Sequence, residues 1–461
     1  MGSLKKGIFA LMLFFCIQSP FAQVAYNEQA QDVINETVRS WNSYKKYAWG
    51  HDVYLPLTHS FSDWYSEPLY ISPIDAYSTL YLMGLQDETA EIERYVIDSL
   101  NFNKNIFVKT FEVNIRILGG LLSMYDLSQN PQILEKAIDF GNRILPAFNT
   151  LTGIPTYWVN LQTGETKGDT VNIAEAGTYL IEMGVLSYYT KDPKYYQAAK
   201  KAVKAVHYAS SSLGLIGDVI QVQNGKWISF QSHICAGVDS YYEYIYKAYL
   251  LFGDPELKII WDNSIPGIQK YLADIYDNKL WFGRAHMYTG EKTSSVITLY
   301  DAFFPALLAL SGNISDARFL QKTWNGVWDM YGLEPMSYDY KKKEVKYPVY
   351  DLNPEIMESA YYLYHFTKDT LYYNMNVKYW NNIKKYCRTE DAFTAIENIK
   401  TMKQGNEMAT YFFAETLKYL FLTFSYHENQ FPFDDYIFST EAHPFKRSHF
   451  NTPETPTYLG F

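Results

Sequence analysis

The stretch LFGDPELKII, residues 251–260, contains the turn that decides the fold. An apolar helix end meets Gly253 and Asp254, and a second helix begins directly afterwards. Asp254 is a natural N-cap, because its side-chain oxygen can accept a hydrogen bond from an otherwise unpaired amide in the first turn of the next helix. The stretch therefore predicts a tight turn between two helices.

The same pattern returns along the chain with Asn or Asp at the turn. The turn residues are separated by 62, 62, 59 and 56 residues and are Asn130, Asp192, Asp254, Asn313 and Asp369. Related stretches around Asp87 and His427 extend the series to seven turns. Self-similarity at a nearly fixed period is the signature of a repeat architecture.

Two kinds of helix flank these turns. Those before a turn, such as residues 180–189, are apolar nearly all round, whereas those after it, such as residues 193–209, are amphipathic with lysines on one face. Fully apolar helices belong inside a fold and amphipathic ones outside. We therefore predict an all-α fold, an (α/α)7 barrel of seven helical hairpins. An open α-solenoid is the competing architecture, since a constant period is compatible with both.

The composition is that of a folded globular chain. Of its 461 residues, 48% are hydrophobic and 18% aromatic, including 43 Tyr. Tyrosine buries a large area while keeping a polar tip, so this excess suits packed helix layers or a surface that binds sugar rings. The net charge is −10, and no cluster of Lys or Arg has the size that a phosphate backbone requires. We expect a single domain over residues 23–461, a monomer, and no nucleic-acid partner.

The N-terminus has the three parts of a secretory signal peptide. Lys5 and Lys6 precede an apolar run over residues 8–17, and small residues follow up to Ala22. Such a run is too short to span a bilayer. We expect residues 1–22 to be a signal peptide and the mature chain to lack an integral membrane segment. The predicted location is the periplasm, cell surface or extracellular space, with the eukaryotic secretory pathway less favoured.

Cysteine usage agrees with a simple exported chain. Cys16 falls inside the signal peptide, where lipidation stays open as an alternative. Cys235 and Cys387 remain after cleavage, and the sequence leaves open whether they form a disulfide. The plain signal and the few cysteines favour a bacterial source.

Acidic residues recur near the start of each predicted inner helix, about 12 to 18 residues before its turn: Asp75, Glu112, Glu175, Asp239, Asp301, Glu355 and Glu415. At 1.5 Å per residue they lie roughly 18 to 27 Å from the turns, at one end of the bundle. In a closed barrel they converge. Alternatively, some of them complement a helix macrodipole. Asp239 and Glu243 fit a convergent site better, because bulky aromatic neighbours have little reason to surround solvated charges.

A ring of carboxylates in a helical cup favours glycoside hydrolysis, in which one acid protonates the leaving oxygen and another activates water or attacks. The same ring could hold a metal, and oxygen-only ligands favour calcium over zinc. No His/Cys spacing typical of zinc, no G-x-S-x-G elbow and no P-loop occurs in the sequence. Zinc, serine-hydrolase and phosphoryl-transfer chemistry are therefore disfavoured.

Four segments carry a family resemblance. PIDAYSTLYLMGL (73–85), FEVNIRILGGLLSMYDLS (111–128), GVDSYYEYIYKAYLLFGD (237–254) and FSTEAHPF (438–445) resemble signature blocks of glycoside hydrolase family 47, the class I α-1,2-mannosidases. The match runs in order from about residue 41 to 445. LPAFNTLTGIP (145–155) looks closest to the branch of the ER degradation-enhancing α-mannosidase-like proteins. Family members fold as (α/α)7 barrels, so the resemblance implies the fold that the repeats predict.

The resemblance also implies roles for individual residues. Glu112 matches the proton donor, Asp239 a second catalytic carboxylate and Glu355 the base that activates water. Thr440 matches the residue that binds Ca2+ through its hydroxyl and backbone carbonyl. The remaining matches line the substrate pocket and are Arg116, as charge partner of Glu112, with Glu175, Glu358, Tyr411, Glu415 and Glu441. The implied function is that of a Ca2+-dependent inverting exo-α-1,2-mannosidase acting on a high-mannose-type oligosaccharide or N-glycan.

Several positions depart from the family pattern. Asn353 replaces an arginine that holds sugar and base, which exchanges a five-donor fork for a short neutral amide. Met336 replaces an acidic residue, and whether adjacent Glu334 substitutes for it is open. Ala409 and Thr410 replace a Glu-Ser pair, and ITLYDAFFP (297–305) lacks a pocket histidine of the processing mannosidases. Because the core carboxylates and Thr440 are present, we expect a hydrolase with altered subsites.

Two other classes remain open from the sequence. One is a catalytically impaired, lectin-like protein that binds mannose-type glycans through calcium, which the loss of the arginine favours. The other is a helical-barrel lyase or hydrolase of uronic acids. A pocket this acidic would repel an acidic sugar, so the second class is disfavoured.

Overall fold

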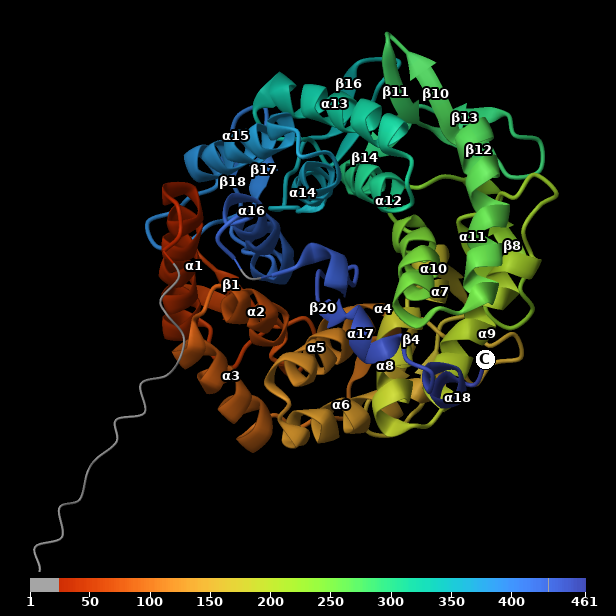
Figure 1. The fold of residues 1–461 in the computed structure, drawn as a ribbon, viewed down its shortest axis with the longest axis horizontal. Coiled ribbons are helices and arrows are strands. Elements are labelled where there is room, and N and C mark those ends of the chain that lie inside the picture. Colours follow the sequence, from red (N-terminus) through yellow and green to blue (C-terminus); the bar gives the residue numbers. More distant parts are fainter. Residues whose placement is uncertain (1–24, 430) are drawn as a thin grey trace, which may run out of the picture.

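The computed structural model describes residues 25–429 and 431–461, and its helices form a closed ring (Figure 1). The predicted signal peptide, residues 1–22, and Cys16 within it lie outside the described residues. Within the described part of the chain, seven inner helical runs alternate with seven outer helices. The structure is the (α/α)7 barrel that the repeats predict.

The inner runs lie around the axis of the ring. They are α2 (Ile71–Leu82), α4–η1–α5 (Thr110–Val113, Asn114–Leu118, Gly119–Ser128), α7–α8 (Ile173–Gly177, Leu180–Thr190), α10 (Asp239–Phe252), η4–α12 (Leu299–Phe303, Phe304–Leu310), α14 (Glu355–Thr367) and η5–α16 (Phe412–Thr416, Leu417–Phe424). The outer helices are α1 (Glu28–Tyr47), α3 (Gln86–Asp98), α6 (Pro131–Ile144), α9 (Lys194–Tyr208), α11 (Pro255–Gly267), α13 (Ile314–Tyr331) and α15 (Thr370–Tyr386).

Inner helices are buried nearly all round, as their apolar sequences predict. In α2 every residue from Ile71 to Leu80 is buried, whereas α9 buries one face and exposes Lys194 and Lys201. The inner layer is so tight that a Cβ on Gly120 would lie 2.5 Å from Cγ2 of Ile74. The neighbouring inner helices α2 and α5 are therefore closely packed.

The predicted turn residues act as caps. Asn130, Asp254, Asn313 and Asp369 are the N-caps of α6, α11, α13 and α15, and each accepts a hydrogen bond from a first-turn amide. Asp192 accepts one from the amide of Lys194 at 3.1 Å. Two members of the series differ. Asp87 lies inside the first turn of α3, which begins at Gln86 without a side-chain cap, and the turn near His427 is followed by no outer helix in sequence order.

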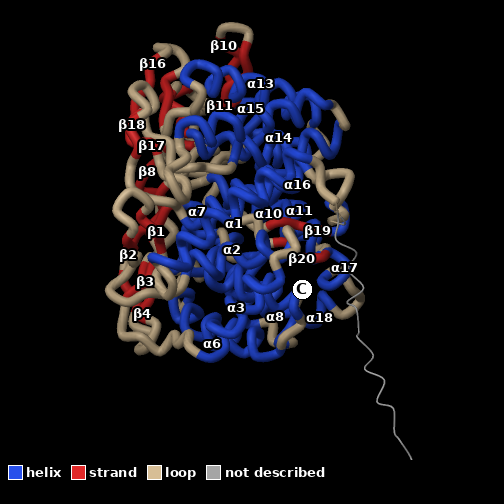
Figure 2. Tube along the Cα trace, turned by 90° about the vertical axis from the view of Figure 1, so that its left-hand side faces the viewer, coloured by secondary structure: helices blue, strands red, loops and turns tan. Residues whose placement is uncertain are grey.

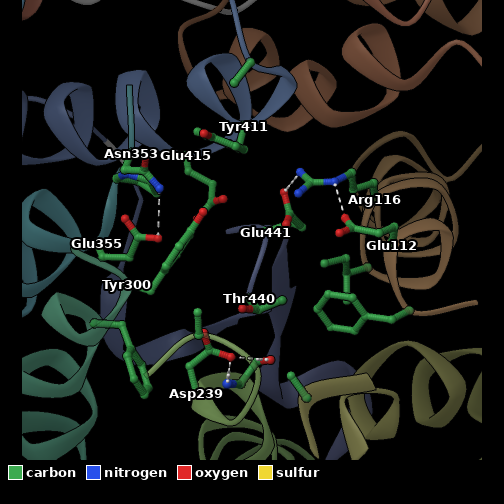
Figure 3. A pocket seen from close by; sticks show the side chains of 18 of the residues that line it. Glu112, Arg116, Asp239, Tyr300, Asn353, Glu355, Tyr411, Glu415, Thr440 and Glu441 are labelled. Atoms are coloured by element: carbon green, nitrogen blue, oxygen red, sulfur yellow. Dashed lines mark hydrogen bonds and ion pairs between the residues drawn. The ribbon is translucent and has the colours of Figure 1, made fainter. Parts of the chain in front are cut away.

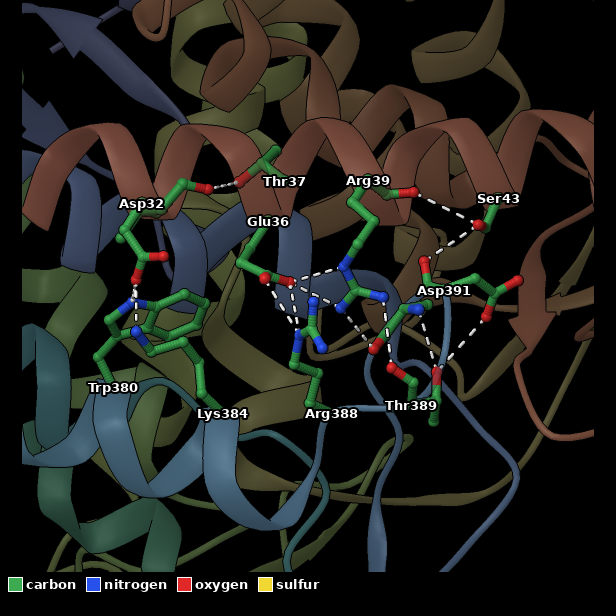
Figure 4. Close-up of polar contacts among 12 residues, drawn as sticks. Asp32, Glu36, Thr37, Arg39, Ser43, Trp380, Lys384, Arg388, Thr389 and Asp391 are labelled. Atoms are coloured by element: carbon green, nitrogen blue, oxygen red, sulfur yellow. Dashed lines mark hydrogen bonds and ion pairs between the residues drawn. The ribbon is translucent and has the colours of Figure 1, made fainter. Parts of the chain in front are cut away.

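The missing seventh outer helix is supplied by the N-terminal helix α1, which packs beside α15 and α16 (Figure 1). Asn27, the N-cap of α1, donates a hydrogen bond to the carbonyl of Phe424 at the end of α16. Asp32 accepts hydrogen bonds from Nε1 of Trp380 at 2.7 Å and Nζ of Lys384 at 2.5 Å (Figure 4). The two ends of the repeat series therefore join, and the open solenoid is excluded.

Return connections from outer to inner helices contain short antiparallel strands, which mostly gather at one end of the barrel (Figure 2). The strands are β1 (Val53–Leu55), β2 (Ser60–Ser62), β3 (Phe107–Lys109), β4 (Trp158–Asn160), β5 (Thr166–Lys167), β6 (Thr170–Asn172), β7 (Val219–Gln221), β8 (Trp227–Ser229), β9 (Gln231–Ser232), β10 (Ala273–Tyr276), β11 (Lys279–Phe282), β12 (Arg284–His286), β13 (Lys292–Ser294), β14 (Val296–Thr298), β15 (Ser337–Asp339), β16 (Glu344–Tyr347), β17 (Ile396–Asn398) and β18 (Lys403–Gln404).

One hairpin lies apart from these strands. β19 (Tyr436–Phe438) pairs with β20 (Pro444–Lys446), and the pair lies on the other side of the barrel (Figure 2). We call residues 436–446 the plug hairpin. Its turn is closed by the amide of Ser439, which donates to the carbonyl of His443 at 2.9 Å, and Ala442 adopts the left-handed conformation with φ of 53°. The short helices α17 (Arg447–Phe450) and α18 (Thr455–Leu459) follow the hairpin; the other short helical turns are η2 (Leu145–Phe148), η3 (Ile268–Leu272) and η6 (Phe433–Asp435).

The cysteine question left open by the sequence has an answer. Cys235 and Cys387 are both buried as free thiols, and the Cys235 thiol donates to Oδ2 of Asp301 at 3.1 Å. They therefore form no disulfide. No helix within residues 25–429 and 431–461 combines the length and apolar character needed to cross a membrane.

Candidate active site

A cavity of about 420 Å³ lies where the inner helices begin, and the turn of the plug hairpin lines it from within the barrel (Figure 3). All of the residues proposed for the site from the sequence line this cavity: Glu112, Arg116, Glu175, Asp239, Glu355, Glu358, Tyr411, Glu415, Thr440 and Glu441. They come from five inner helical runs and the plug hairpin. The structure thus brings together residues spread over more than 300 positions of sequence.

Five of the seven helix-start acids line the cavity, and two lie outside it. Asp301 is buried in a capping box with Thr298, so the helix-terminus interpretation holds for it. Asp75 is buried below the cavity, where its Oδ2 lies 3.5 Å from Arg116. Glu175 has both roles: it caps a helix, in a capping box with Asn172, and it also lines the cavity.

Arg116 is the positive centre of one wall. Its Nε donates to Oε2 of Glu112 at 3.2 Å, and Nη1 lies 2.5 Å from Oε2 of Glu441 (Figure 3). Arg116 and Glu112 are four residues apart across the α4–η1 junction, the spacing at which helical side chains meet. Although burial opposes the charged form, the surrounding carboxylates, Glu441 first, raise the pKa of Arg116.

Asp239 begins α10 on another wall. It accepts a hydrogen bond from the amide of Ser240 at 2.7 Å, and burial is the main cause that raises its pKa to about 7. Glu243, one turn further, also lines the cavity and is paired with buried Lys247 at 2.5 Å. Lys247 lies 3.5 Å from Glu358 as well. Both carboxylates of α10, Asp239 and Glu243, therefore face the cavity. Glu243 also has a buried counter-ion, Lys247.

Glu355 begins α14 and lies across the cavity from Glu112 (Figure 3). Burial raises its pKa to about 8, and Asn353 is within 3.4 Å of its Oε1. Within the described residues, Oε2 of Glu355 and Oδ1 of Asn353 are buried without a hydrogen-bond partner. The amide that replaces the family arginine thus contacts the predicted base on one oxygen and leaves the other free.

At the second departure from the family pattern, Met336, no neighbouring acid takes the place of the missing one in the cavity. Met336 is partly buried against the hydrophobic core, and neither Met336 nor Glu334 lines the cavity. Glu334 is fully buried and both of its carboxylate oxygens lack a partner among the described residues. Burial raises its pKa well above the ordinary value, so a neutral acid is favoured. Glu334 therefore does not take the place of the missing side chain at the cavity surface.

The floor is formed by Thr440 and Glu441 at the turn of the plug hairpin and by Glu415 in η5. Burial, followed by the like charge of Glu441, raises the pKa of Glu415. Tyr411 donates its hydroxyl hydrogen to the carbonyl of Asp351 at 2.9 Å and lies beneath Arg116, with the guanidinium 5.7 Å from its ring centroid. This contact fixes the tyrosine ring at the cavity wall.

Sequence analysis missed several lining residues. Trp64, with its ring 5.1 Å from the Arg116 guanidinium, comes from an irregular connection that has no periodic signal. Tyr300 and Glu407 also line the cavity, and Tyr300 could have been noticed only from its position next to the helix-start acid Asp301. Aromatic faces beside carboxylates are suited to sugar rings.

The lining suits an oxygen-loving cation. Among the described residues, nine carboxylates face the cavity, while Arg116 is the only Lys or Arg in its lining. No group of three His, Cys, Asp or Glu side chains there forms a ready-made metal cage. Calcium accepts carbonyl, hydroxyl and water oxygens as well as carboxylates. Thr440, with a hydroxyl and a carbonyl at the floor, is thus a suitable anchor for a largely hydrated calcium ion.

A helical barrel whose cavity holds carboxylates on opposite walls has the design of a glycoside hydrolase. The chain belongs to glycosyl hydrolase family 47, whose family model matches residues 36–447.

Individual relatives agree with this assignment. The chain is 32% identical to alpha-mannosidase I MNS5 of Arabidopsis thaliana, over 96% of this chain and 83% of that protein. It is 31% identical to ER degradation-enhancing alpha-mannosidase-like protein 1 of Schizosaccharomyces pombe, over 96% of this chain and 60% of that longer protein. The solved structure of the alpha-1,2-mannosidase from Trichoderma reesei superposes with a TM-score of 0.84 and 27% identity, covering 92% of this chain and all of that one. These relatives are eukaryotic and give the expected bacterial origin no support.

Proposed function

We propose that this glycoside hydrolase is an exported, Ca2+-dependent, inverting exo-α-1,2-mannosidase that removes terminal α-1,2-linked mannose from high-mannose-type oligosaccharides. The observation that carries the proposal is the pair Glu112 and Glu355, which occupy opposite walls of a cavity closed at its floor (Figure 3). Similarity over the whole barrel to an α-1,2-mannosidase supports the linkage. The family resemblance supports the assignment of roles below.

The closed floor supports an exo mode of action. The plug hairpin fills the barrel at the end opposite the strand-bearing connections, and Thr440 and Glu441 lie at the bottom of the cavity. A chain that enters from the open end can therefore present only its terminal sugar. An internal sugar would require a groove that is open at both ends.

Glu112 is assigned the general acid. Arg116 holds one of its oxygens at 3.2 Å, and its side chain is 23% exposed, so the other oxygen can reach the leaving oxygen of a bound glycoside. In an inverting reaction the acid and the base act from opposite faces of the sugar, with carboxyl groups about 6.5 to 9.5 Å apart to admit a water molecule. The opposite wall is the place for the base.

Glu355 is assigned the general base. Its unpartnered Oε2 can accept a proton from a water molecule that attacks the anomeric carbon. Asp239 is assigned a second catalytic carboxylate, whose negative charge would stabilise the positive charge that develops on the sugar ring in the transition state. Glu175, Glu358, Tyr411, Glu415 and Glu441 would position the sugar, and Arg116 would keep Glu112 and Glu441 in place.

Thr440 is assigned the calcium-binding residue through its hydroxyl and backbone carbonyl. When bound, the ion would supply a fixed positive charge that orients sugar hydroxyls and water. The acidic lining supports this assignment, since the carboxylates around the floor outnumber their counter-ions.

Three further properties complete the proposal. Residues 1–22 act as a signal peptide, residues 23–461 form one catalytic domain, and the mature chain is exported. We also propose that the protein is a monomer. A mannose-containing oligosaccharide or N-glycan is the proposed partner.

The test compares release of mannose from α-1,2-linked mannobiose by the wild-type chain and by Glu355→Gln, with calcium and with a chelator. Turnover that needs calcium and falls at least about 1,000-fold in Glu355→Gln is expected. Glu344→Gln, in exposed β16, is the matched control and should retain wild-type activity. The contact of Asn353 with the base favours one alternative, a glycan-binding protein without turnover. Saturable, calcium-dependent binding of mannobiose without release would establish it, and absence of both binding and release would refute the proposed substrate.

A further inference from the structure

Behind the cavity floor lies a buried polar chain that the reaction scheme does not use. It joins Asn114 in η1, Glu182 in α8, Tyr244 in α10 and the backbone of Thr440 in the plug hairpin. Glu182 and Tyr244 are completely buried, and neither side chain lines the cavity. The four residues come from segments that are far apart in sequence and meet only in the closed barrel.

Each link of the chain is a hydrogen bond. The amide of Thr440 donates to the hydroxyl oxygen of Tyr244 at 3.3 Å. The Tyr244 hydroxyl donates to Oε1 of Glu182 at 2.5 Å, and Nδ2 of Asn114 donates to Oε2 of Glu182 at 3.0 Å. The Asn114 amide also donates to the carbonyl of Thr178 at 3.1 Å, which ties the chain to the break between α7 and α8.

The direction of these bonds is fixed by their chemistry. A backbone amide can only donate, so the Tyr244 oxygen must accept from Thr440 and use its single hydrogen toward Glu182. Hydrogen bonds in a dry interior are strong. Glu182 therefore sets the orientation of the tyrosine hydroxyl, which in turn fixes the peptide plane that precedes Thr440.

Packing brings these groups within reach. Gly119 lies between Glu182 and the plug hairpin, and a Cβ at that position would lie 3.0 Å from Cδ2 of His443 and 3.4 Å from Cγ of Glu182. The absence of a side chain at Gly119 allows both to approach the same inner helix. On the far side of the turn, buried Lys418 donates to the carbonyl of Ala442 at 2.5 Å. The hairpin turn is thus held from two sides of the barrel.

A burial cost is the reason to infer a function. Burying a carboxyl that has no Lys or Arg partner costs free energy, which its hydrogen bonds offset. An apolar side chain at the same place would avoid this cost. Within the described residues Glu182 forms no ion pair, and Tyr244 and Asn114 are its side-chain partners. Replacement of all three by apolar groups would satisfy the core equally well.

We propose that Tyr244 and Glu182 are positioning residues for the cation: they hold Thr440 in the orientation in which its hydroxyl and carbonyl point to one calcium ion. The inference rests on the proposed function, in which Thr440 binds calcium. Preorganised ligands bind more tightly because less conformational freedom is lost on binding. Loss of the Tyr244 hydroxyl should therefore weaken calcium binding without removing a ligand.

The test measures calcium affinity directly by isothermal titration of the chelator-treated, dialysed full chain with CaCl2. Tyr244→Phe keeps the ring and removes the hydroxyl, and we expect an increase in Kd of about tenfold, the effect reported for residues that orient metal ligands. Glu182→Gln keeps the shape and one acceptor oxygen, and we expect a smaller increase of about threefold. Thr440→Ala should abolish measurable binding.

Tyr196→Phe is the matched control. Tyr196 is also fully buried and donates its hydroxyl hydrogen to a carboxylate, Oδ2 of Asp254 at 2.7 Å, but at the turn between α10 and α11. We expect it to lower the Tm as much as Tyr244→Phe does and to leave the calcium Kd unchanged. Circular dichroism at the titration temperature shows whether each variant is folded. If Tyr244→Phe is unfolded, the calcium Kd of Glu182→Gln is compared with that of the wild type instead.

The outcomes separate the inference from the function on which it rests. A wild-type chain that binds no calcium overturns both. Wild-type binding that is lost in Thr440→Ala but unchanged in Tyr244→Phe and Glu182→Gln overturns the inference alone. Equal weakening in Tyr244→Phe and Tyr196→Phe also overturns it, because the effect would then follow from stability.

Discussion

The guanidinium of Arg116 lies 2.5 Å from the carboxylate of Glu441 and so joins an inner helix to the plug hairpin. The same side chain contacts Glu112 at 3.2 Å and approaches Asp75 at 3.5 Å. One buried cation therefore connects the proposed acid, the cavity floor and a carboxylate beneath it.

Arg116→Ala should impair both folding and catalysis. It leaves Glu441 and Asp75 buried without their counter-charge, and breaking a buried ion pair costs about 3–5 kcal/mol. We expect the free energy of unfolding to fall by that amount and kcat/KM to fall at least about 100-fold. Arg116→Lys keeps the positive charge but loses the several N–H donors of the guanidinium. Its free energy of unfolding should therefore lie between those of the wild type and of Arg116→Ala. Urea unfolding and mannobiose kinetics give both values, and an Arg116→Ala chain that matches wild type in each would refute this role.

The calcium-free chain should lose stability as the pH rises. Burial raises the folded-state pKa of Asp239 from 3.8 to about 7 and that of Glu355 from 4.5 to about 8. Both acids then bind protons more tightly in the folded state, so their stabilising effect is complete at low pH and disappears as the pH rises through the folded pKa. A shift of this size in Asp239 alone is worth on the order of 4 kcal/mol.

Unfolding in urea with chelator at pH 5 and pH 8 measures this effect. We expect the free energy of unfolding to be lower at pH 8, and added calcium to recover most of the loss by binding the folded state. Asp239→Asn should reduce the dependence on pH. Higher stability at pH 8 than at pH 5 in the presence of chelator would contradict the burial of these acids.

Two helical glycines should respond in opposite ways to alanine. A Cβ on Gly120 in α5 would lie 2.5 Å from Ile74, whereas one on Gly326 in α13 would meet only the end of the flexible Lys279 side chain, at 3.6 Å. Gly120→Ala should therefore lower the free energy of unfolding by about 1–3 kcal/mol through overpacking. Gly326→Ala should raise it by up to about 1 kcal/mol, because alanine favours helix. Similar effects of the two substitutions on Tm would argue against the close packing at Gly120 and the open surroundings of Gly326.

Closure of the ring by α1 predicts a stability effect far from the cavity. Glu36 in α1 contacts Arg388, which follows α15, at 3.1 Å and is largely buried (Figure 4). Glu36→Ala should lower the free energy of unfolding by about 1–2 kcal/mol and leave kcat at 25 °C unchanged. The matched control is Asp262→Ala, which breaks an exposed pair within α11 and should cost less than about 0.5 kcal/mol. If both variants unfold alike, α1 does not close the ring in solution.

Patterns that repeat along the chain predicted the fold well. The capped turns at Asn130, Asp254, Asn313 and Asp369 follow from local chemistry, which a sequence records directly. A closed barrel was predicted, but the helix that closes it was not, because the partner of α16 is helix α1, at the other end of the chain. The short strands of the return connections were also missed, since two or three residues carry no measurable alternation.

The site also contains residues that the sequence could predict and residues that it could not. Helix-start acids could be found because one residue per repeat lies at the same height, and the family motifs supplied Thr440 and Glu441. Asp301 shows the limit of that rule, since it caps a helix beside the cavity. Glu182 and Tyr244 could not be found, because a buried polar chain is visible only when its helices are packed together.

The central claim is that this chain hydrolyses α-1,2-linked mannose with inversion, with Glu112 as acid and Glu355 as base. Proton NMR of α-1,2-linked mannobiose during turnover in calcium buffer tests it most directly, because the anomeric signals distinguish the first product from its mutarotated form. The account predicts that β-mannose appears first and that α-mannose grows in only later. First appearance of α-mannose would contradict the opposed acid and base, and a spectrum without released mannose would contradict the activity itself.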